Sequence, residues 1–219
     1  MCVNIMENFP SIGMVRLKEG IMRLFLVFTL LFLSIVASGD NRNEGFIIDI
    51  VNAAKERTKH DVRYDGSYIS IPYPNGDVPS DIGVCTDVVI RSFRKVGVDL
   101  QKRVHEDMSS NFMLYPSKRI WGLKKPDKNI DHRRVPNLRV FFTKYGESLK
   151  VTNNPEDYSP GDLVTWKLPG NLPHIGIVID MKSKNGNIPL IAHNIGEGPK
   201  INDMLFEYPI TGHYRYIGK

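Results

Sequence analysis

The sequence predicts an α+β fold in which helices come first and an antiparallel sheet is formed mainly by the C-terminal half. Apolar residues recur at helical spacing in the first part of the chain, and short apolar runs separated by turn residues begin at Pro160. Helices followed by a strand meander are typical of this fold class. With 219 residues, of which 42% are hydrophobic and 24% charged, we expect one compact domain.

The N-terminus has the features of a secretory signal. Met22 and Arg23 precede an apolar run at residues 24–37, which is too short to span a bilayer of about 30 Å comfortably. We expect residues 1–39 to be the signal, with Met22 as an alternative translation start, and residues 40–219 to be the exported domain. The destination in a Gram-negative cell is the periplasm, with no integral membrane segment after cleavage. The alternative is an uncleaved signal that tethers the protein to the membrane.

Two helices are expected before the sheet. The first begins at about Phe46, where apolar residues fall on one helical face. A proline-rich loop at residues 68–79 leads to a second helix, which carries Cys85 in its first turn. We expect Asp81 to cap the start of this helix and Gly97 to end it.

The remaining elements are predicted from turn residues and apolar runs. Four prolines between residues 101 and 158 indicate an inserted region of loops with at most short helices. Strands are expected at residues 163–166, 175–179, 190–193 and 214–217, with Asn185-Gly186 as a hairpin turn.

Cys85 is the only cysteine of the expected exported domain, because Cys2 lies in the signal. It therefore has no partner for an internal disulfide, and an unpaired thiol in an oxidising compartment is either buried and inert or a working nucleophile. The formal net charge of +5 is mild. Without a block of Lys and Arg residues or an RNA-binding aromatic signature, this charge gives no support to a nucleic-acid partner.

A thiol at the start of a helix is well placed for nucleophilic attack. The unpaired N–H groups there favour the thiolate and can also donate to the oxyanion of a tetrahedral intermediate. We therefore expect Cys85 to be the nucleophile and the neighbouring Thr86 to belong to the oxyanion or substrate site. The alternative for Cys85 is a small hydrophobic residue of the core.

His174 is the best candidate for the general base among the six histidines. It opens an expected strand, and Gly176 leaves room for another group to approach. The alternative is a hydrogen-bonded histidine at a sheet edge. A zinc site of His132, His174 and His193 lacks any close pair of ligands, so no metal or cofactor is expected.

The hairpin register predicts which residue orients the base. With a two-residue turn at residues 185–186, opposed residues sum to 371, so His193 shares a sheet face with His174 but lies about 13 Å away along the strand. A longer loop, with a sum of 369, opposes His193 to Gly176 and brings the two histidines into diagonal contact. Asn194 is the alternative orienting residue if a bulge shifts the register by one.

Five short strings of the sequence resemble the bacterial domain-of-unknown-function family 1287. They begin at Gly83, Asp131, Pro160, Leu172 and His193 and read GVCTD, DHRRVPNL, PGDLV, LPHIG and HNIG. The resemblance runs from about residue 46 to residue 216. The order of a cysteine on a helix start, a histidine on a strand and a third polar residue on the next strand is also similar to the NlpC-type branch of papain-like cysteine hydrolases.

This resemblance implies a papain-like fold with Cys85, His174 and His193 as the catalytic residues. Many members of the branch carry a tyrosine shortly before the cysteine, and Tyr73 is the matching candidate. The residues on either side of the cysteine differ from the usual pattern of the branch, and a long insert separates the nucleophile from the base.

Three basic residues of the insert are candidates for substrate binding. His132, Arg133 and Arg134 are adjacent in the sequence, and guanidinium groups bind carboxylates through two hydrogen bonds. We expect a carboxylate-binding patch here, with a solvated turn as the alternative.

Together these residues predict an exported cysteine peptidase or amidase that cleaves an amide bond in cell-wall (peptidoglycan) peptides through a thioester acyl-enzyme. We expect a peptide or peptidoglycan-like substrate, no cofactor and a monomeric protein. Two alternatives stay open. One is a papain-like hydrolase of a different ester or amide, and the other is a non-catalytic module that binds the cell wall or a partner on the same fold.

Overall fold

The computed structural model describes residues 43–218, and the residues from Gly45 onward form one compact unit. The predicted signal and the alternative start at Met22 lie outside the described residues. In the described part, no helix is long and apolar enough to cross a membrane.

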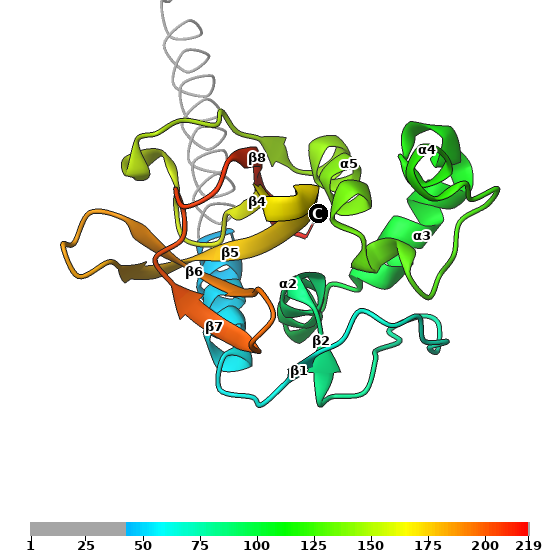
Figure 1. Ribbon diagram of the computed structural model, residues 1–219, viewed down its shortest axis with the longest axis horizontal. Helices are drawn as coiled ribbons and strands as arrows, with labels where there is room; N and C mark the ends of the chain where they lie inside the picture. The colour runs from blue at the N-terminus through cyan, green and yellow to red at the C-terminus, as the bar shows by residue number, and fades with distance from the viewer. Residues whose placement is uncertain (1–42, 219) are drawn as a thin grey trace, which may run out of the picture. The chain divides into compact units, whose positions relative to one another are not determined.

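Helices dominate the first two thirds of the described chain (Figure 1). A first helix covers residues 43–57. It is followed by α2 (Cys85–Lys95), α3 (Leu100–Asn111), α4 (Ser117–Trp121) and α5 (Val135–Tyr145). The 3-10 turns are η1 (Phe112–Leu114), η2 (Asp131–Arg133), η3 (Pro155–Asp157) and η4 (Pro169–Asn171).

The main sheet has six antiparallel strands in the order β3-β8-β4-β5-β6-β7. Their bounds are β3 (Glu147–Ser148), β4 (Leu163–Leu168), β5 (Leu172–Lys182), β6 (Pro189–Asn194), β7 (Pro199–Asn202) and β8 (Ile210–Arg215). A separate parallel pair, β1 (Arg63–Tyr64) and β2 (Ile82–Gly83), precedes α2. The predicted α+β class, with helices first and an antiparallel sheet from the C-terminal half, is confirmed.

Helix α2 begins at Cys85, as predicted, and Gly97 follows its end with a left-handed φ of 81°. The predicted cap at Asp81 is wrong. Instead, the backbone N–H of Val84 donates to the Asp87 carboxylate over 2.7 Å. A carboxylate in the first turn can reach back to the residue that precedes the helix, so Asp87 closes the start of α2 from inside.

The region between residues 101 and 158 contains two full helices, so the prediction of loops there is wrong. Helix α3 turns Leu100, Val104 and Met108 toward the core, and all three are fully buried. In α5, Pro136 lies in the first turn, where its missing N–H removes no helical hydrogen bond. The proline here marks the start of a helix rather than the absence of one.

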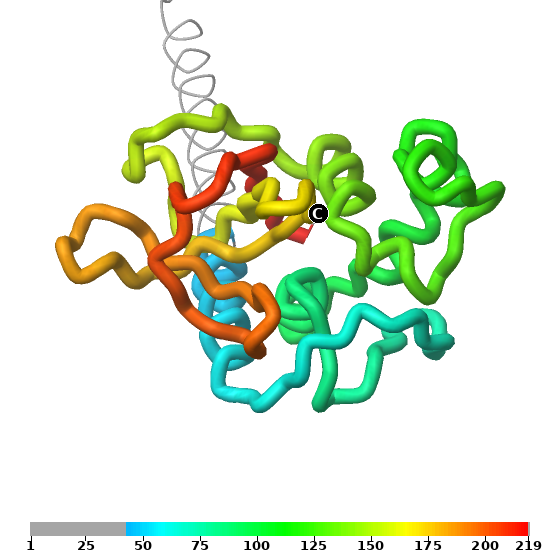
Figure 2. The backbone as a smooth tube through the Cα atoms, in the orientation of Figure 1, coloured from blue at the N-terminus to red at the C-terminus, as the bar shows by residue number. Residues whose placement is uncertain are grey.

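Two hydrophobic clusters pack against the sheet. One joins the helices with Ile175 and Ile177 of β5, and the other joins Trp166, Val178 and Met204. Successive strand residues point to opposite faces, so these clusters lie on the two faces of the sheet. Helix α2 packs on β5 and β6, and α5 packs on β5 and β8. Figure 2 shows the chain passing from the helices, in green, into the strands, in yellow to red.

Candidate active site

Cys85 lies where the start of α2 meets the start of β5. Its exposed fraction is 5%, and it forms no disulfide. Backbone N–H groups of Ile175, Thr86 and Cys85 itself point to the sulfur and favour its thiolate. Because Ile175 directly follows His174, the thiol lies beside the strand segment that carries the predicted base.

Burial outweighs these N–H groups. It raises the pKa of Cys85 to about 12, and the charge of Asp87 adds to the increase. The predicted stabilisation of the thiolate by the helix start is therefore present but smaller than the cost of desolvation. The thiol is neutral at neutral pH in this closed arrangement.

The second feature of the site is a contact between two histidines. His174 Nε2 and His193 Nδ1 are 3.0 Å apart, and their rings are nearly perpendicular. The register explains this contact. Near the turn, Lys182 opposes Pro189, and the two residue numbers sum to 371. Beyond an irregularity in the pairing, Ile177 opposes Ala192, and the sum is 369. Of the two predicted registers, the one with the longer loop is present at the site.

Gly176 makes the approach of the two strands possible. A Cβ atom added there would lie 2.5 Å from Ile191 Cγ2 and 3.1 Å from His193 Cβ, and the first distance is a steric clash. We expect Gly176→Ala to cost about 1–3 kcal/mol of stability by overpacking and to displace His193 from His174. Gly45→Ala is the matched control, because no atom of residues 43–218 lies within 4 Å of its added Cβ. Equal unfolding midpoints for the two variants would contradict this account.

Asn202 extends the contact into a relay. Its Oδ1 lies 3.2 Å from His193 Nε2, and an amide oxygen can only accept. His193 therefore carries its proton on Nε2 and accepts at Nδ1, so His174 must donate from Nε2. This leaves His174 Nδ1 free to accept a proton. The sequence reasoning did not include Asn202, whose strand β7 was not predicted.

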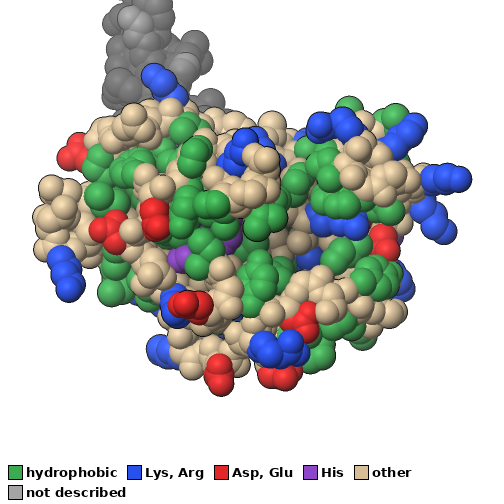
Figure 3. Space-filling view, viewed as in Figure 1, with side chains coloured by type: hydrophobic (Ala, Val, Ile, Leu, Met, Phe, Trp, Pro, Cys, Tyr) green, Lys and Arg blue, Asp and Glu red, His purple; other side chains and the backbone are tan. Residues whose placement is uncertain are grey.

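Both histidines of the relay are neutral at neutral pH. Burial lowers the pKa of His174 to about 3, with the neighbouring His193 adding to the effect, and lowers that of His193 to about 4. Among the described residues, the Cys85 thiol and the His174 ring are not hydrogen-bonded to each other. Histidine side chains are visible among mostly hydrophobic side chains where β5 and β6 lie beside α2 (Figure 3).

Other predicted site residues have different partners. Asn194, the alternative orienting residue, donates to the Gly83 carbonyl over 3.4 Å and thereby ties β6 to the segment before Cys85. The Thr86 hydroxyl donates to the Arg133 carbonyl over 3.1 Å, so only its backbone N–H faces the sulfur. The ring of Tyr73 packs edge-on against His105 of α3.

Tyr64 is the tyrosine that interacts electrostatically with the thiol. Its side chain is 42% exposed, and its pKa is raised to about 12 by partial burial of the ring and by the proximity of Cys85 and Asp87, which disfavour a second negative charge. Tyr64 lies on β1, which pairs with β2 just before α2. The sequence reasoning selected Tyr73 because it is closer along the chain, but the parallel pairing of β1 brings the more distant Tyr64 to the site.

Two residues of the predicted basic patch, Arg133 and Arg134, bind carboxylates of their own chain. Arg133 binds Asp87 with Nε and Nη2 over 2.9 and 2.8 Å, and the two side chains are 2% and 4% exposed. His132 is also buried, which lowers its pKa to about 3. Arg134 lies over the ring of Trp121 and bonds Asp131. Arg133 thus binds a carboxylate of its own chain, which neither predicted alternative included.

Within residues 43–218, no group of three or more His, Cys, Asp and Glu side chains is arranged to hold a metal ion.

Comparison with known proteins identifies the family. The model of the family described as "Domain of unknown function (DUF1287)" matches residues 51–216. The chain belongs to the DUF1287 family. It is also 49% identical over 170 residues to the "Uncharacterized protein YijF" of Escherichia coli strain K12, which covers 78% of this chain and 82% of that protein. All the strings that suggested the family lie within the matched residues.

Three buried histidines predict that this DUF1287 protein loses stability in acid. Burial lowers the pKa of His132, His174 and His193 to about 3, 3 and 4. An unfolded histidine titrates near 6.5, so the unfolded chain binds more protons below that pH. These three histidines therefore cause no loss of folding free energy above about pH 6.5. Below that pH, each of them lowers the free energy of unfolding by up to about 1.4 kcal/mol per pH unit. Asp131 opposes this trend, because burial raises its pKa to about 6.

Denaturation midpoints between pH 7 and pH 5 test this prediction. We expect a clear decrease in the wild type and a shallower one in His132→Leu, which removes one buried titrating group. His60→Gln is the control, since His60 is exposed. A wild-type midpoint that does not change over this range would contradict the prediction.

Proposed function

We propose that this chain is an exported cysteine hydrolase with a papain-like, NlpC-type fold, and that it cleaves an amide bond in cell-wall peptides through a thioester acyl-enzyme. The observation that carries the proposal is the relay of His174, His193 and Asn202 beside a thiol that receives backbone N–H groups. The relay fixes the tautomer in which His174 Nδ1 accepts a proton. A purely structural role for these buried polar groups does not require that tautomer.

The chemistry proceeds in two halves. The Cys85 sulfur attacks the carbonyl carbon while His174 Nδ1 takes the thiol proton, and His174 then gives that proton to the leaving nitrogen as the C–N bond breaks. Water next attacks the thioester and passes a proton to His174. The carbon–sulfur bond breaks, and the proton returns to the sulfur. The N–H groups of Cys85 and Thr86 at the start of α2 lie where they can stabilise the oxyanion.

His193 orients His174 as a neutral residue, because burial lowers its pKa. His193 holds the tautomer of His174 but supplies no negative charge to stabilise an imidazolium, and burial disfavours the charged forms of both reacting groups. We therefore propose that the resting state is a thiol with a neutral imidazole rather than a preformed ion pair. Proton transfer then accompanies attack, after substrate binding has brought Cys85 and His174 into hydrogen-bond reach.

Purified peptidoglycan tests the substrate class. We expect mass spectrometry to find new peptide fragments after incubation with the wild type and none with Cys85→Ala. The relay variant Asn202→Leu should reduce the yield without abolishing it, because it removes an orienting group and no reacting group. Activity on another ester or amide without peptidoglycan fragments would contradict the substrate while sparing the mechanism. Fragments released equally by Cys85→Ala would contradict the mechanism.

The burial of the thiol favours one competing function, a non-catalytic module that binds the cell wall or a partner. Such a module needs no accessible sulfur, and Cys85 is 5% exposed with a raised pKa. Labelling of the folded protein with iodoacetamide separates the two functions. A hydrolase must open enough to admit a substrate, so Cys85 should be labelled under native conditions. Labelling that requires unfolding would favour the binding module.

A further inference from the structure

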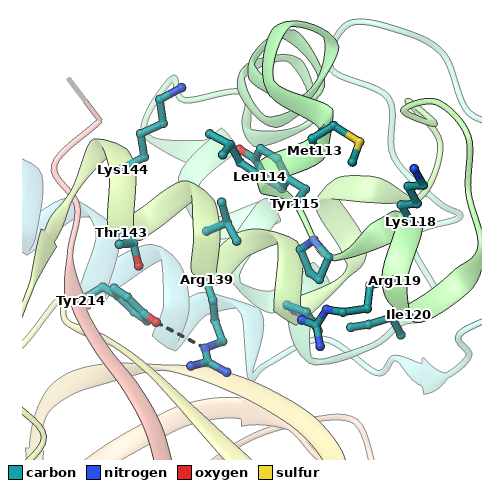
Figure 4. A pocket seen from close by; sticks show the side chains of 13 residues that line it. Met113, Leu114, Tyr115, Lys118, Arg119, Ile120, Arg139, Thr143, Lys144 and Tyr214 are labelled. Carbon is teal, nitrogen blue, oxygen red and sulfur yellow. Dashed lines mark hydrogen bonds between the residues drawn. The ribbon is translucent and has the colours of Figure 1, made fainter.

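A groove of about 950 Å³ lies away from the thiol, between α5 on one side and η1 and α4 on the other (Figure 4). Cys85, His174 and His193 do not line it. Its volume is at the upper end of the range that is typical of ligand sites. The groove is therefore a candidate for a binding function that the thiol chemistry does not use.

The charges along the groove all have one sign. Lys118 and Arg119 lie on the α4 side, Arg139 and Lys144 lie on the α5 side, and no acidic residue of the described part of the chain lines the groove. Lys118 and Arg119 have no ion-pair partner among the described residues, in contrast to Lys144, which is bound to Asp107. Lys and Arg side chains are gathered over this part of the surface (Figure 3).

The groove lies in the part of the chain that carries most of the net charge. Residues 113–128 contain five Lys and Arg residues and one Asp, a net charge of +4, against +5 for the whole chain. Lys118 and Arg119 are the two basic residues of this segment that line the groove, whereas Lys124 and Lys125 lie outside it, so only the first pair can contact an anionic ligand bound there.

The guanidinium of Arg139 is fixed by contacts with β8. Its Nη2 donates to the Thr211 carbonyl over 2.6 Å, and its Nε lies 3.4 Å from the Tyr214 hydroxyl. These bonds fix the guanidinium and leave Nη1 for a ligand. A preorganised donor binds an anion with a smaller entropic cost than a free side chain.

Apolar side chains form the rim of the groove. Met113, Leu114 and Ile120 are 70%, 64% and 47% exposed. An exposed apolar cluster of this kind marks an interaction site, and a purely ionic ligand would leave it in water. The ligand must therefore carry apolar groups as well as negative charge.

We propose that this groove binds an extended acidic peptide whose carboxylates contact Lys118, Arg119 and Arg139 and whose apolar side chains cover Met113, Leu114 and Ile120. A peptide fits better than an anionic membrane, because Arg139 is half-buried and bonded to Thr211 of β8, so a chain that enters the groove meets its guanidinium more readily than a flat bilayer surface does. Peptide binding in this groove does not depend on the hydrolase chemistry.

Fluorescence anisotropy with a labelled peptide of alternating glutamate and leucine tests this proposal. We expect binding that weakens with salt and that is lost when glutamine replaces glutamate or serine replaces leucine. The variant Lys118→Gln/Arg119→Gln should weaken binding roughly tenfold or more, since hydrogen bonds between charged groups are strong. Lys124→Gln/Lys125→Gln is the matched control, because it removes the same charge outside the groove.

Equal losses in the two double variants, or no binding by the wild type, would overturn the proposal. Stronger binding to phosphatidylglycerol vesicles than to the peptide, lost in the groove variant, would assign the site to a membrane and also overturn it. The same titration with Cys85→Ala keeps the two functions apart. Peptide binding that persists without any hydrolase activity would support the groove and contradict only the proposed catalysis.

Discussion

Replacing Arg133 with methionine should lower the free energy of unfolding by about 3–5 kcal/mol, because it leaves the Asp87 carboxylate buried without its counter-charge. Both side chains of the pair are almost fully buried, and two hydrogen bonds join them. Arg133 also donates to the carbonyl of Ser67 over 3.3 Å. One guanidinium therefore connects the start of α2 to η2 and to the loop after β1.

Urea denaturation measures this loss, and Arg63→Met is its control. Arg63 also pairs with an aspartate, Asp65, but its side chain is 69% exposed, and exposed pairs contribute about 0–1 kcal/mol. Arg133→Lys should lie between the wild type and Arg133→Met, because it keeps the charge but loses the paired geometry. A loss in Arg133→Met no larger than that in Arg63→Met would show that the buried pair is not a main support of α2.

Much of the sheet and the place of the thiol could be predicted from the sequence. The apolar runs of β4, β5 and β6 are bounded by glycine, proline and asparagine, so their existence follows from local signals. The position of Cys85 follows from the apolar spacing of α2. The strands β3 and β7 have two and four residues, and segments this short carry no periodic pattern that could predict them.

The parts of the site that could not be predicted depend on long-range packing. The register that joins His193 to His174 depends on an irregularity within the β5–β6 pair, and the sequence allowed both registers. Burial of Arg133 depends on Asp87, which is distant in the chain and carries no signal of its partner. The pairing of β1 with β2 brings Tyr64 toward the thiol for the same reason. Local patterns predict elements, whereas these contacts exist only after the elements pack.

Replacing His174 should change turnover and thiol reactivity in opposite directions. Loss of this proposed general base should reduce turnover by roughly 10²–10⁴-fold. In His174→Ala, however, the lost ring admits water beside the sulfur, so desolvation weakens and the pKa of Cys85 falls from about 12. Alkylation of Cys85 should therefore become faster at a given pH in the variant that has lost its activity.

The rate of alkylation by iodoacetamide, measured against pH, separates this mechanism from a preformed ion pair. We expect one rising limb at alkaline pH in the wild type, because a thiol with a raised pKa is neutral below it and His174, with a lowered pKa, carries no charge near neutrality. The curve for His174→Ala should lie at lower pH. His174→Gln, which fills most of the same space, should lose turnover but keep the wild-type curve.

A plateau of reactivity at acid pH in the wild type that disappears in His174→Ala would establish a thiolate–imidazolium pair and contradict the neutral resting state. Turnover that survives in both variants would remove His174 from the mechanism.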